Sequence, residues 1–519
     1  MKQSSPLKGS MFQRSLTTQR EFAELRVRLR GSIRLEPLPV RHTSRSYFDT
    51  FDWRLYRKGL ALEFDDSTPA VVRLREIGAS AAYEEQALEA LPKFASGFPA
   101  GVLREWLVLT LGERALLPLG SMTLRITPYR ASDDQGKILY FLDKEQFLQK
   151  GAGQRGRTLF TGVRIRALRG YEKAGRQALS LLGKRSGRSA SPADPFERCM
   201  RVLGRVPGEY STRLRIKLSA EISARAAIAE ILLFLLDIME RNVPGLEEDL
   251  DSEFLHDFRI AARRSRSLIS RTLGIFAGRE MARIKRDFSW LSQVTSGQRD
   301  LDVFLYDLPR YQAEPEMGRP EHLEPLRALL EEDRGTEHAR LRAALRSRRF
   351  LSFVDDWREL LVDAAAATGT GMPLAIVANG SIRRQYRKLM KQVPEAGHYS
   401  EALHDLRKNG KQLRYLLEGF RSLYPAEEIE EVIAQLRKLQ NVLGGIVDFH
   451  VQRTRLLGWR DRLVARPDVP VDTFAALDRL VNRFDAMETR AADGFFACYT
   501  RFAAADNTAR FTRLFGEAA

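Results

Sequence analysis

The sequence predicts an α+β protein with two domains, a β-rich N-terminal domain followed by an all-α C-terminal domain. Two observations lead to this fold class. Short runs rich in β-branched and aromatic residues, separated by turn residues, recur within the first 180 residues. From about residue 215 onward they give way to long segments in which apolar residues recur with the 3.6-residue period of a helix. A chain of 519 residues is long enough for two or more domains, each with its own core.

The N-terminal domain is predicted over residues 1–182. Arginine alternates with apolar residues in several of its strand-like runs, which would make one face of each strand apolar and the other basic. Residues 183–195, GKRSGRSASPADP, are rich in Gly, Ser and Pro and indicate a linker, which we place at residues 183–214. The predicted strands are residues 25–29, 70–77, 106–112, 121–130, 137–147 and 161–168.

The all-helical domain is predicted over residues 215–510, which is too long for one simple four-helix bundle. Its segments have few internal prolines, as expected of helices. The predicted helices are residues 219–242, 254–275, 280–294, 301–307, 320–346, 351–366, 376–392, 400–423, 427–443 and 472–504.

The helical half contains an internal repeat with an offset of 148 residues. Residues 255–269, LHDFRIAARRSRSLI, correspond to residues 403–417, LHDLRKNGKQLRYLL. A constant offset indicates two copies of one helical unit. The matched pairs are Leu255 and Leu403, His256 and His404, Asp257 and Asp405, Arg259 and Arg407, Arg263 and Lys411, Arg266 and Arg414, Leu291 and Leu439, Val294 and Val442, and Asp300 and Asp448.

The repeated basic residues are spaced so that each copy carries them on one side of a helix. Positions i, i+3, i+7 and i+10 fall in a stripe about 80° wide and roughly 15 Å long. One stripe consists of His256, Arg259, Arg263 and Arg266, and the other of His404, Arg407, Lys411 and Arg414. The opposite, packing side is predicted to hold Phe258, Ala262, Ser265 and Ile269 in the first copy and Leu406, Gly410, Leu413 and Leu417 in the second.

Such stripes suit a chain of phosphates, because guanidinium groups donate forked hydrogen bonds and lysine adds a point charge. A lone basic stripe is usually a solvated helix face, but surface charges need not keep their spacing between diverged copies. Two facing rows would repel one another unless a polyanion or nearby carboxylates compensated them. The carboxylates expected to contribute are Asp257, Asp405, Asp300 and Asp448. The candidate site also includes Arg264 and Lys408, together with Arg384, Arg387 and Lys388, which either widen it or form a solvated face.

Composition points to an anionic partner in a reducing compartment. The formal net charge is +17, and there are only two cysteines, Cys199 and Cys498. The most apolar segment, residues 226–239, is interrupted by Glu230 and Asp237 and is shorter than a membrane span, so we expect a cytoplasmic protein that does not enter a membrane. The histidines lack metal-ligand spacing and a Walker motif is missing, so we predict no catalytic residue, no metal and no cofactor.

The C-terminal half resembles a CHAD domain over roughly residues 215–510. The resemblance is carried by the two HxxR helices, each followed by an Asp-bearing segment, TSGQRDLDVFL at 295–305 and LGGIVDFHV at 443–451. It implies two pseudo-symmetric four-helix bundles with basic residues around a central groove or pore. It also implies binding of inorganic polyphosphate and recruitment to polyphosphate granules. One departure is Ser296, where the second copy has Gly444, which leaves the local turn open.

The N-terminal half resembles a diverged CYTH domain, a family whose fold is an antiparallel β-barrel. YFDTFDWRLYRKGLALEF at 47–64, ILYFLDKEQF at 138–147 and VRIRALRG at 163–170 carry this resemblance. In that family, Glu-x-Glu pairs hold a divalent metal inside a triphosphate tunnel.

In this chain arginine replaces most of the acids that the CYTH resemblance implies. The best match to the first Glu-x-Glu-x-Lys strand is ELRVR, which keeps Glu24, and the second Glu-x-Glu pair is replaced by arginines. We therefore expect no catalytic metal, since arginine has neither the charge nor the lone pair of a metal ligand. The candidate anion site of the barrel is Arg26, Arg28, Arg73, Arg75, Arg125, Arg130, Arg164 and Arg166. These arginines either point inward and make a cationic cavity or point outward and solubilise the sheet.

The sequence thus favours a non-catalytic protein that binds inorganic polyphosphate on granules in the cytoplasm. One alternative is a metal-dependent triphosphatase or phosphotransferase that acts through the barrel, which the missing carboxylates disfavour. The other is a nucleic-acid-binding protein, which the net charge permits. The stripes disfavour it, because Phe258 and Tyr415 are predicted to lie off them and base stacking needs exposed aromatic rings.

Overall fold

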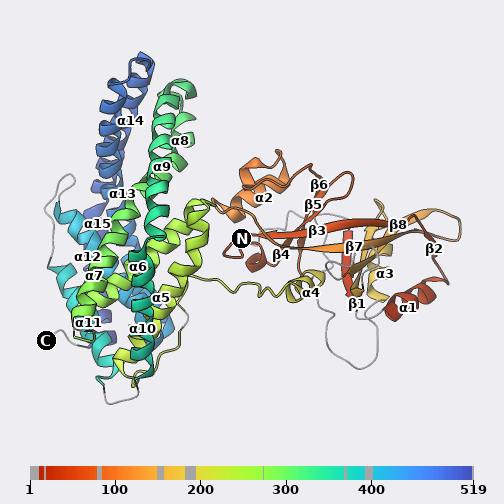
Figure 1. The fold of residues 1–519 in the computed structure, drawn as a ribbon, viewed down its shortest axis with the longest axis horizontal. Helices are drawn as coiled ribbons and strands as arrows, with labels where there is room; N and C mark the ends of the chain where they lie inside the picture. The colour runs from red at the N-terminus through yellow and green to blue at the C-terminus, as the bar shows by residue number, and fades with distance from the viewer. Residues whose placement is uncertain are drawn as a thin grey trace. The chain divides into compact units, whose positions relative to one another are not determined.

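The computed structural model divides into two compact units, residues 1–211 and residues 212–519. The first is built on a β-sheet and the second is helical (Figure 1), so the predicted α+β fold class is confirmed. The structure describes residues 11–16, 19–78, 84–148, 157–181, 194–214, 216–272, 274–276, 278–367, 371–391 and 401–516.

One antiparallel sheet organises the first unit. Its strands follow the order β1-β9-β8-β7-β3-β4-β5-β6, and β2 pairs with β7. The described residues show no pairing between β1 and β6, the two short strands that end this path, so the sheet is open where the resemblance implied a closed barrel. The strands are β1 (Met11–Leu16), β2 (Arg34–Pro37), β3 (Arg41–Asp49), β4 (Leu60–Asp65), β5 (Val71–Glu76), β6 (Glu84–Ala87), β7 (Leu117–Ser132), β8 (Ile138–Leu148) and β9 (Thr158–Ala167).

Two of the predicted strands are helices. Residues 25–29 belong to α1 (Gln19–Leu29), which buries Leu25 and Leu29 against β7, β8 and β9. Residues 106–112 lie largely in α2 (Val102–Leu111), which buries Leu103, Leu107 and Leu111. Leucines four residues apart fit a helix face as well as an alternating strand, and short apolar runs do not distinguish the two. The other four predicted strands are confirmed as β5, β7, β8 and β9.

The two faces of the sheet have different partners. α1 and α3 (Glu172–Leu181) cover one face of β7, β8 and β9 with an apolar core, and α2 covers the same face of β4 and β5. The opposite face, which we call the inner face, carries Arg45, Glu63 and Arg164. The short helix α4 (Pro195–Val202) packs Phe196, Cys199 and Met200 into an apolar cluster with residues of β3, β7 and β9. α4 falls inside the predicted linker of residues 183–214 but belongs to the first unit.

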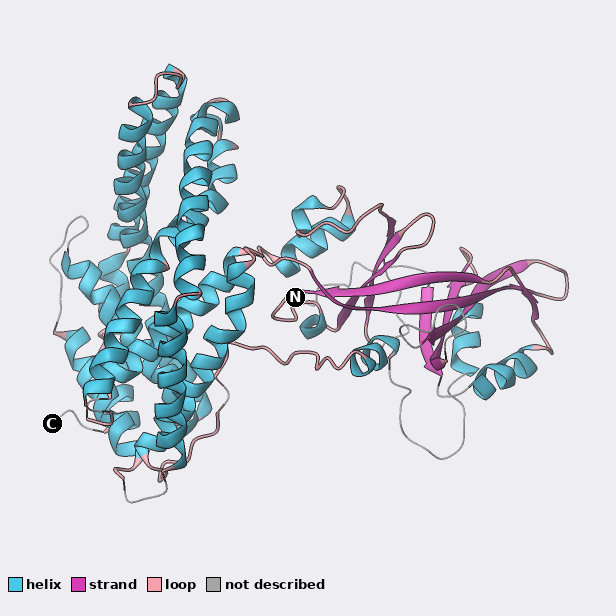
Figure 2. Ribbon diagram, in the orientation of Figure 1, coloured by secondary structure: helices cyan, strands magenta, loops and turns pink. Residues whose placement is uncertain are grey.

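The second unit is built of helices and loops (Figure 2), and its helices follow one another in two matching series. A shift of 148 residues takes α5 onto α11, α6 onto α12, the pair α7 and α8 onto α13, α9 onto α14, and α10 onto the pair α15 and α16. The helices are α5 (Ala224–Glu247), α6 (Ser252–Arg271), α7 (Arg279–Val294), α8 (Ser296–Gln312), α9 (Glu324–Leu345), α10 (Arg348–Ala366), α11 (Leu374–Met390), α12 (Glu401–Phe420), α13 (Ala426–Val464), α14 (Val471–Asp493), α15 (Phe495–Phe502) and α16 (Ala505–Phe515).

The copies differ in where their helices break. The first is interrupted at Thr295, between α7 and α8, whereas α13 continues through Gly444 and extends well beyond the predicted end at residue 443. The second copy breaks instead between α15 and α16. One apolar core joins the copies, because α8 and α9 of the first share it with α13 and α14 of the second. The repeats therefore form one folded body.

The packing side predicted for the two basic helices is confirmed for seven of the eight residues, whereas Ala262 of α6 is only partly buried and lines the same groove as Arg259 and Arg263. Phe258, Ser265 and Ile269 are buried on α6, and all four predicted residues are buried on α12. The α6 helix begins where the side chain of Asp251 accepts hydrogen bonds from the backbone N–H groups of Glu253 and Phe254, at 2.9 and 3.3 Å. This cap fixes the start of the helix five residues before His256, the first residue of the basic stripe.

Across the residues that the model describes, none of the helices combines the length and the apolar character needed to span a bilayer.

Candidate functional site

The basic helices α6 and α12 pack against each other and line a common groove with α7. The groove has a volume of about 600 Å³. Its basic lining consists of Arg259, Arg263, Arg266, Arg271, His404, Arg407, Lys408 and Lys411. None of the described lining residues is acidic. The two stripes predicted from the repeat therefore meet, and they form one cationic concavity.

The matched arginines of the two copies are held differently. On α6, Arg259 donates a hydrogen bond of 2.6 Å from Nη1 to the hydroxyl of Thr295, the residue at the break between α7 and α8. On α12, Arg407 forms an ion pair with Asp448, with 2.7 and 2.9 Å from Nη2 to the two carboxylate oxygens. The counterpart of Asp448 in the first copy is Asp300, which pairs with Arg455 of α13 instead. A carboxylate thus binds the arginine of α12 directly, whereas in the first copy Asp300 binds Arg455 and acts on Arg259 through its charge.

The crowding of cations lowers the basicity of two groove residues. Burial, together with Arg263, lowers the pKa of Arg259 to about 10. Burial, followed by the neighbouring charges of Arg407 and Arg263, lowers the pKa of Lys411 to about 7. Such shifts mean that positive charge is unfavourable in the empty groove, and an anion placed there would relieve the repulsion.

The groove contains seven of the thirteen basic residues that the sequence proposed for this site. They are Arg259, Arg263, Arg266, His404, Arg407, Lys408 and Lys411. The lining instead extends toward the C-terminal end of α6, where Arg271 joins it. Continuing the helical spacing from Arg263 by two further turns would have found Arg271. Six proposed residues do not line the groove: His256, Arg264, Arg414, Arg384, Arg387 and Lys388.

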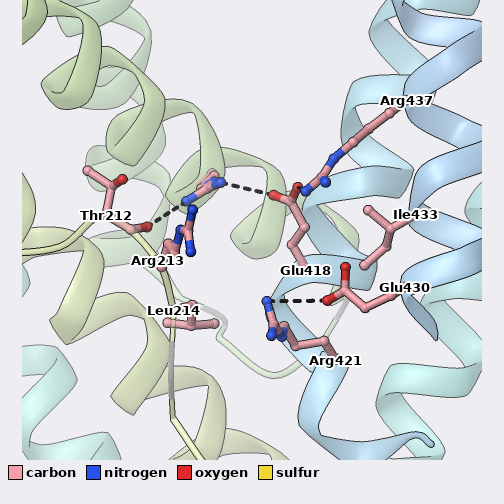
Figure 3. Close-up of a pocket in the computed structure, with 9 residues that line it drawn as sticks. Thr212, Arg213, Leu214, Glu418, Arg421, Glu430, Ile433 and Arg437 are labelled. Carbon is pink, nitrogen blue, oxygen red and sulfur yellow. Dashed lines mark hydrogen bonds and ion pairs between the residues drawn. The ribbon is translucent and has the colours of Figure 1, made fainter. Parts of the chain in front are cut away.

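Two of these six residues belong instead to a group of ion pairs around Glu418 of α12. Arg264 donates to Glu418 at 2.9 Å, and the Arg414 guanidinium lies 3.8 Å from the same carboxylate. Figure 3 shows Arg437 beside Glu418 and the ion pair between Arg421 and Glu430 in the pocket that these residues line. Glu418 and Glu430 therefore offset part of the positive charge of this second pocket, and Arg264 and Arg414 engage Glu418 in place of lining the groove.

The three proposed residues on α11 are exposed and lie outside the groove lining. Arg384 reaches toward the groove, since its Nη2 lies 3.5 Å from the carbonyl of Arg271. The density of basic residues in the sequence could not show that these three residues lie outside the groove, because the orientation of α11 relative to α6 depends on tertiary packing.

Aromatic side chains of the groove are placed differently from the prediction. Tyr415, predicted to lie off the stripe, lines the groove together with Phe288 of α7. Both side chains are buried, with 6% and 2% of their surfaces exposed. The guanidinium groups of Arg264 and Arg414 also lie 5.9 and 5.5 Å from the centre of the Tyr415 ring. Base stacking needs an accessible ring face, and these two buried rings do not offer one.

In the first unit, arginines and carboxylates of the inner face form a buried ionic network. Arg45 of β3 donates to Asp65 of β4 at 2.6 and 3.0 Å and to Glu145 of β8 at 2.9 and 2.8 Å. Arg164 of β9 donates to Glu63 at 2.9 Å. Burial alone would raise the pKa of Asp65, but the nearby Arg45 and Arg73 lower it to about 2. The carboxylates of the network are therefore ionised and matched by arginines.

A further contact brings the segment before α4 onto the inner face. Arg75 of β5 donates to Glu63 at 2.6 Å and to both carboxylate oxygens of Asp194 at 2.7 and 2.6 Å. Asp194 also caps α4 by accepting from the backbone N–H of Phe196 at 2.8 Å. This one carboxylate ties the helix to the sheet.

The structure corrects the proposed anion site of the barrel. Arg26 and Arg28 are exposed on helix α1, and Arg125 and Arg166 are also exposed. Arg130 pairs with Glu36 near the surface. Arg73, Arg75 and Arg164, whose side chains are at least partly buried on the inner face, are all bound to carboxylates.

The inner face does not suit a divalent metal. The first strand of the sheet is β1, which pairs with β9 and whose sequence MFQRSL has no acidic residue, whereas the ELRVR segment predicted for the first strand lies in helix α1. The carboxylates that do lie inside, Glu63, Asp65 and Glu145, accept hydrogen bonds from arginines in place of binding a cation. These carboxylates were not predicted from the sequence, although β4 and β8 carry pairs of acids two residues apart and the neighbouring strands β5 and β9 carry pairs of arginines with the same spacing. Within the described ranges, no three His, Cys, Asp or Glu side chains are grouped to hold a metal.

Comparisons with known proteins bear on the helical unit. Residues 230–457 match the family model of the CHAD domain. Two uncharacterised proteins of Mycobacterium tuberculosis are 30% identical over 231 residues, which are 42% of this chain and 42% of each relative. The chain thus spans less than half the length of the curated relatives it matches.

Two solved structures give weaker likenesses. The CHAD domain of the plant Ricinus communis is 23% identical and covers 56% of this chain and 96% of its own, with a TM-score of 0.48. A candidate adenylyl cyclase from Hippeastrum, described as having a dominant triphosphatase activity, is 15% identical and covers 39% of this chain and 99% of its own, with a TM-score of 0.25. Both TM-scores lie below 0.5, and the match of the helical half to the CHAD domain comes from the family model. The helical half of this chain contains a CHAD domain, matched over residues 230–457.

Proposed function

We propose that this protein binds inorganic polyphosphate, without catalysis, in the groove between α6 and α12. The observation that carries the proposal is the lining itself, in which five arginines, two lysines and a histidine converge without a described acidic side chain. Arginine forks bind phosphate oxygens through paired, charge-assisted hydrogen bonds. Phosphates would supply the negative charge that this cluster lacks.

A polymer fits the groove better than a single phosphate. The basic lining on α6 runs from Arg259 to Arg271, which is about 18 Å along a helix axis. A second row on α12 contributes His404, Arg407 and Lys411. A repeating polyanion can engage many of these cations at once, whereas one phosphate reaches only a few.

Salt dependence and competition together test this proposal. Long-chain polyphosphate should bind the full chain, and the logarithm of the binding constant should fall with the logarithm of the salt concentration with a slope of about −4 or steeper. Each cation engaged contributes about −0.7 to this slope for a single-stranded polyanion. Single-stranded and duplex nucleic acid at equal phosphate concentration should displace little of it, because Tyr415 and Phe288 are buried. Equal displacement by nucleic acid would favour the alternative function of nucleic-acid binding.

We also propose that the first unit is a degenerate CYTH-like domain that hydrolyses no triphosphate. The ionic network supports this, since its carboxylates are bound by Arg45, Arg75 and Arg164. Incubation of the full chain with tripolyphosphate and Mg²⁺ or Mn²⁺ should release phosphate no faster than a no-enzyme control. Metal-dependent release that Glu63→Gln or Glu145→Gln abolishes would instead identify a triphosphatase.

Association with polyphosphate granules in the cytoplasm belongs to the same proposal, because a bound polymer would recruit the protein to the granule surface. The role of the whole protein is likewise proposed, since the matched segment is less than half of each curated relative. A fluorescent fusion should lose its granule foci when the groove cations are removed, and foci that persist would point to recruitment by another surface.

A further inference from the structure

Lys411 occupies an unusual place in the groove. It lies on α12 and lines the groove beside Arg407 and Lys408. It is partly buried, and it forms no hydrogen bond or ion pair with another described residue of the chain. By contrast, the carboxylate nearest to it, Asp448, is engaged by both of its oxygens with Arg407. Lys411 is therefore an amine surrounded by fixed cations.

The charges that face Lys411 come from each helix packed around it. α6 supplies guanidinium groups and α13 supplies one carboxylate, while α12 adds its own cations. The groups are Arg259, Arg263, Arg266 and Arg271 on α6, His404, Arg407, Lys408 and Arg414 on α12, and Asp448 on α13. Burial, followed by the charges of Arg407, Arg263 and Arg414, lowers the pKa of Lys411 to about 7, so that a large fraction of its amine is neutral near neutral pH. Desolvation and neighbouring cations are the conditions that make a lysine nucleophilic.

We propose that Lys411 is a site of covalent acylation by acyl phosphates that enter the groove. The inference rests on the proposed function, because the arginines that would hold a phosphate chain are the ones that would hold the phosphate of the reagent. Arg263 of α6 and Arg407 of α12 line the same groove as Lys411, and their charges act on its amine. A phosphate bound between them brings the attached carbonyl carbon close to Nζ, and such positioning accelerates a reaction.

The reaction balances without a further reagent. The neutral Nζ of Lys411 attacks the carbonyl carbon of the acyl phosphate, and a C–N bond forms. The bond between that carbon and the bridging oxygen breaks, and inorganic phosphate leaves with the electron pair. The nitrogen releases a proton to water, and nothing is oxidised or reduced. Arginines around the departing phosphate stabilise the charge that develops on it.

The product has a consequence for the groove. An amide carries no charge at any physiological pH, so acylation permanently removes the positive charge that the Lys411 amine would take up when a polyanion binds beside it. Affinity for polyphosphate should fall, and bound polyphosphate should in turn shield the amine. The metabolic supply of acyl phosphates would then set how much polyphosphate the protein holds.

Lys408 provides an internal control, since it lies on the same helix and lines the same groove but is exposed. At pH 7.5 an amine with a pKa of about 7 is mostly neutral, whereas an ordinary lysine is roughly 0.1% neutral. A weaker base is also a weaker nucleophile, which leaves an expected advantage of about tenfold for Lys411.

The test is acetylation of the full chain by acetyl phosphate, with site-resolved rates from peptide mass spectrometry. Lys411 should react more than tenfold faster than Lys408, because phosphate recognition adds to the roughly tenfold advantage of its neutral amine, and its rate should level off above about pH 7. An uncharged acetyl ester should give Lys411 a smaller preference, because it has no phosphate for the arginines to bind. Equal rates at Lys411 and Lys408 would overturn the proposal, and an equal preference with the ester would overturn the role of phosphate recognition.

Measuring how polyphosphate changes the rate of acetylation, and how the variants bind it, distinguishes a failure of this proposal from a failure of the proposed function. Long-chain polyphosphate should slow acetylation of Lys411 at least tenfold, and the variant Lys411→Gln should bind the polymer more weakly than Lys411→Arg. Selective acetylation that polyphosphate does not slow would retain the modification site and contradict the proposed ligand. Polyphosphate binding without selective acetylation would retain the proposed ligand and contradict the modification site.

Discussion

Replacing Arg259, Arg263, Arg407 and Lys411 together by alanine should weaken the binding of long-chain polyphosphate by about 10³-fold. Each of the four side chains lines the groove, and each removed phosphate contact is expected to cost about 1 kcal/mol, or a factor of about five. The salt slope should also become shallower by about 3, because four fewer counterions are displaced. Equilibrium titrations at several salt concentrations measure both effects.

A matched control removes the same charge elsewhere on the helical unit. Lys285, Arg286, Arg342 and Arg348 are exposed and do not line the groove. Their joint replacement by alanine should change affinity less than tenfold, through the general field of the protein alone. If both quadruple variants lost affinity equally, binding would depend on net charge, and the groove would not be the site.

Replacing Arg45 by alanine should destabilise the first unit by about 3–5 kcal/mol. Its side chain is fully buried and binds two carboxylates, Asp65 and Glu145. Removing the guanidinium leaves these charges without their main partner in a region that water does not reach, which is what makes the loss large. Denaturant unfolding followed by hydrogen exchange in peptides of β3, β4 and β8 reports on this unit separately from the helical one.

The exposed Arg125 of β7 is the control for this experiment, since a surface substitution is expected to cost less than about 0.5 kcal/mol. Peptides of α6 and α12 should be unaffected in either variant. A loss below about 1 kcal/mol for Arg45→Ala would mean that the network relaxes or that water enters it.

How far the helical site could be predicted is clear from its two basic helices. The spacing of Arg259, Arg263 and Arg266 is set by the local 3.6-residue period, so their common side follows from sequence alone. The 148-residue repeat then predicted two such helices, and α6 and α12 are those helices. Which neighbours share the groove depends on how helices pack. His256 and Arg414 obey the same spacing but do not line it, while Arg271 does.

For the sheet, patterns within single segments predict less than they do for the helical unit, and contacts between segments decide more. Segments with strong strand character, such as residues 121–130 and 161–168, were predicted, yet 25–29 became a helix because its leucines pack on the sheet. The alternation placed Arg73 with Arg75, and Arg164 with Arg166, on one face of their respective strands but could not say which face. The carboxylate partners of Arg75 and Arg164 lie on other strands and on the segment before α4.

The sequence by itself determined the α+β division, the repeat, and the two rows of cations, because all three depend on patterns within single elements. Only the tertiary structure decided that the rows meet in one groove and that glutamates withdraw Arg264 from it. The same holds for the arginines inside the sheet, which are neutralised by carboxylates distant in sequence. Coulomb energy depends on distance and burial, and both are properties of the packed chain that no single segment contains.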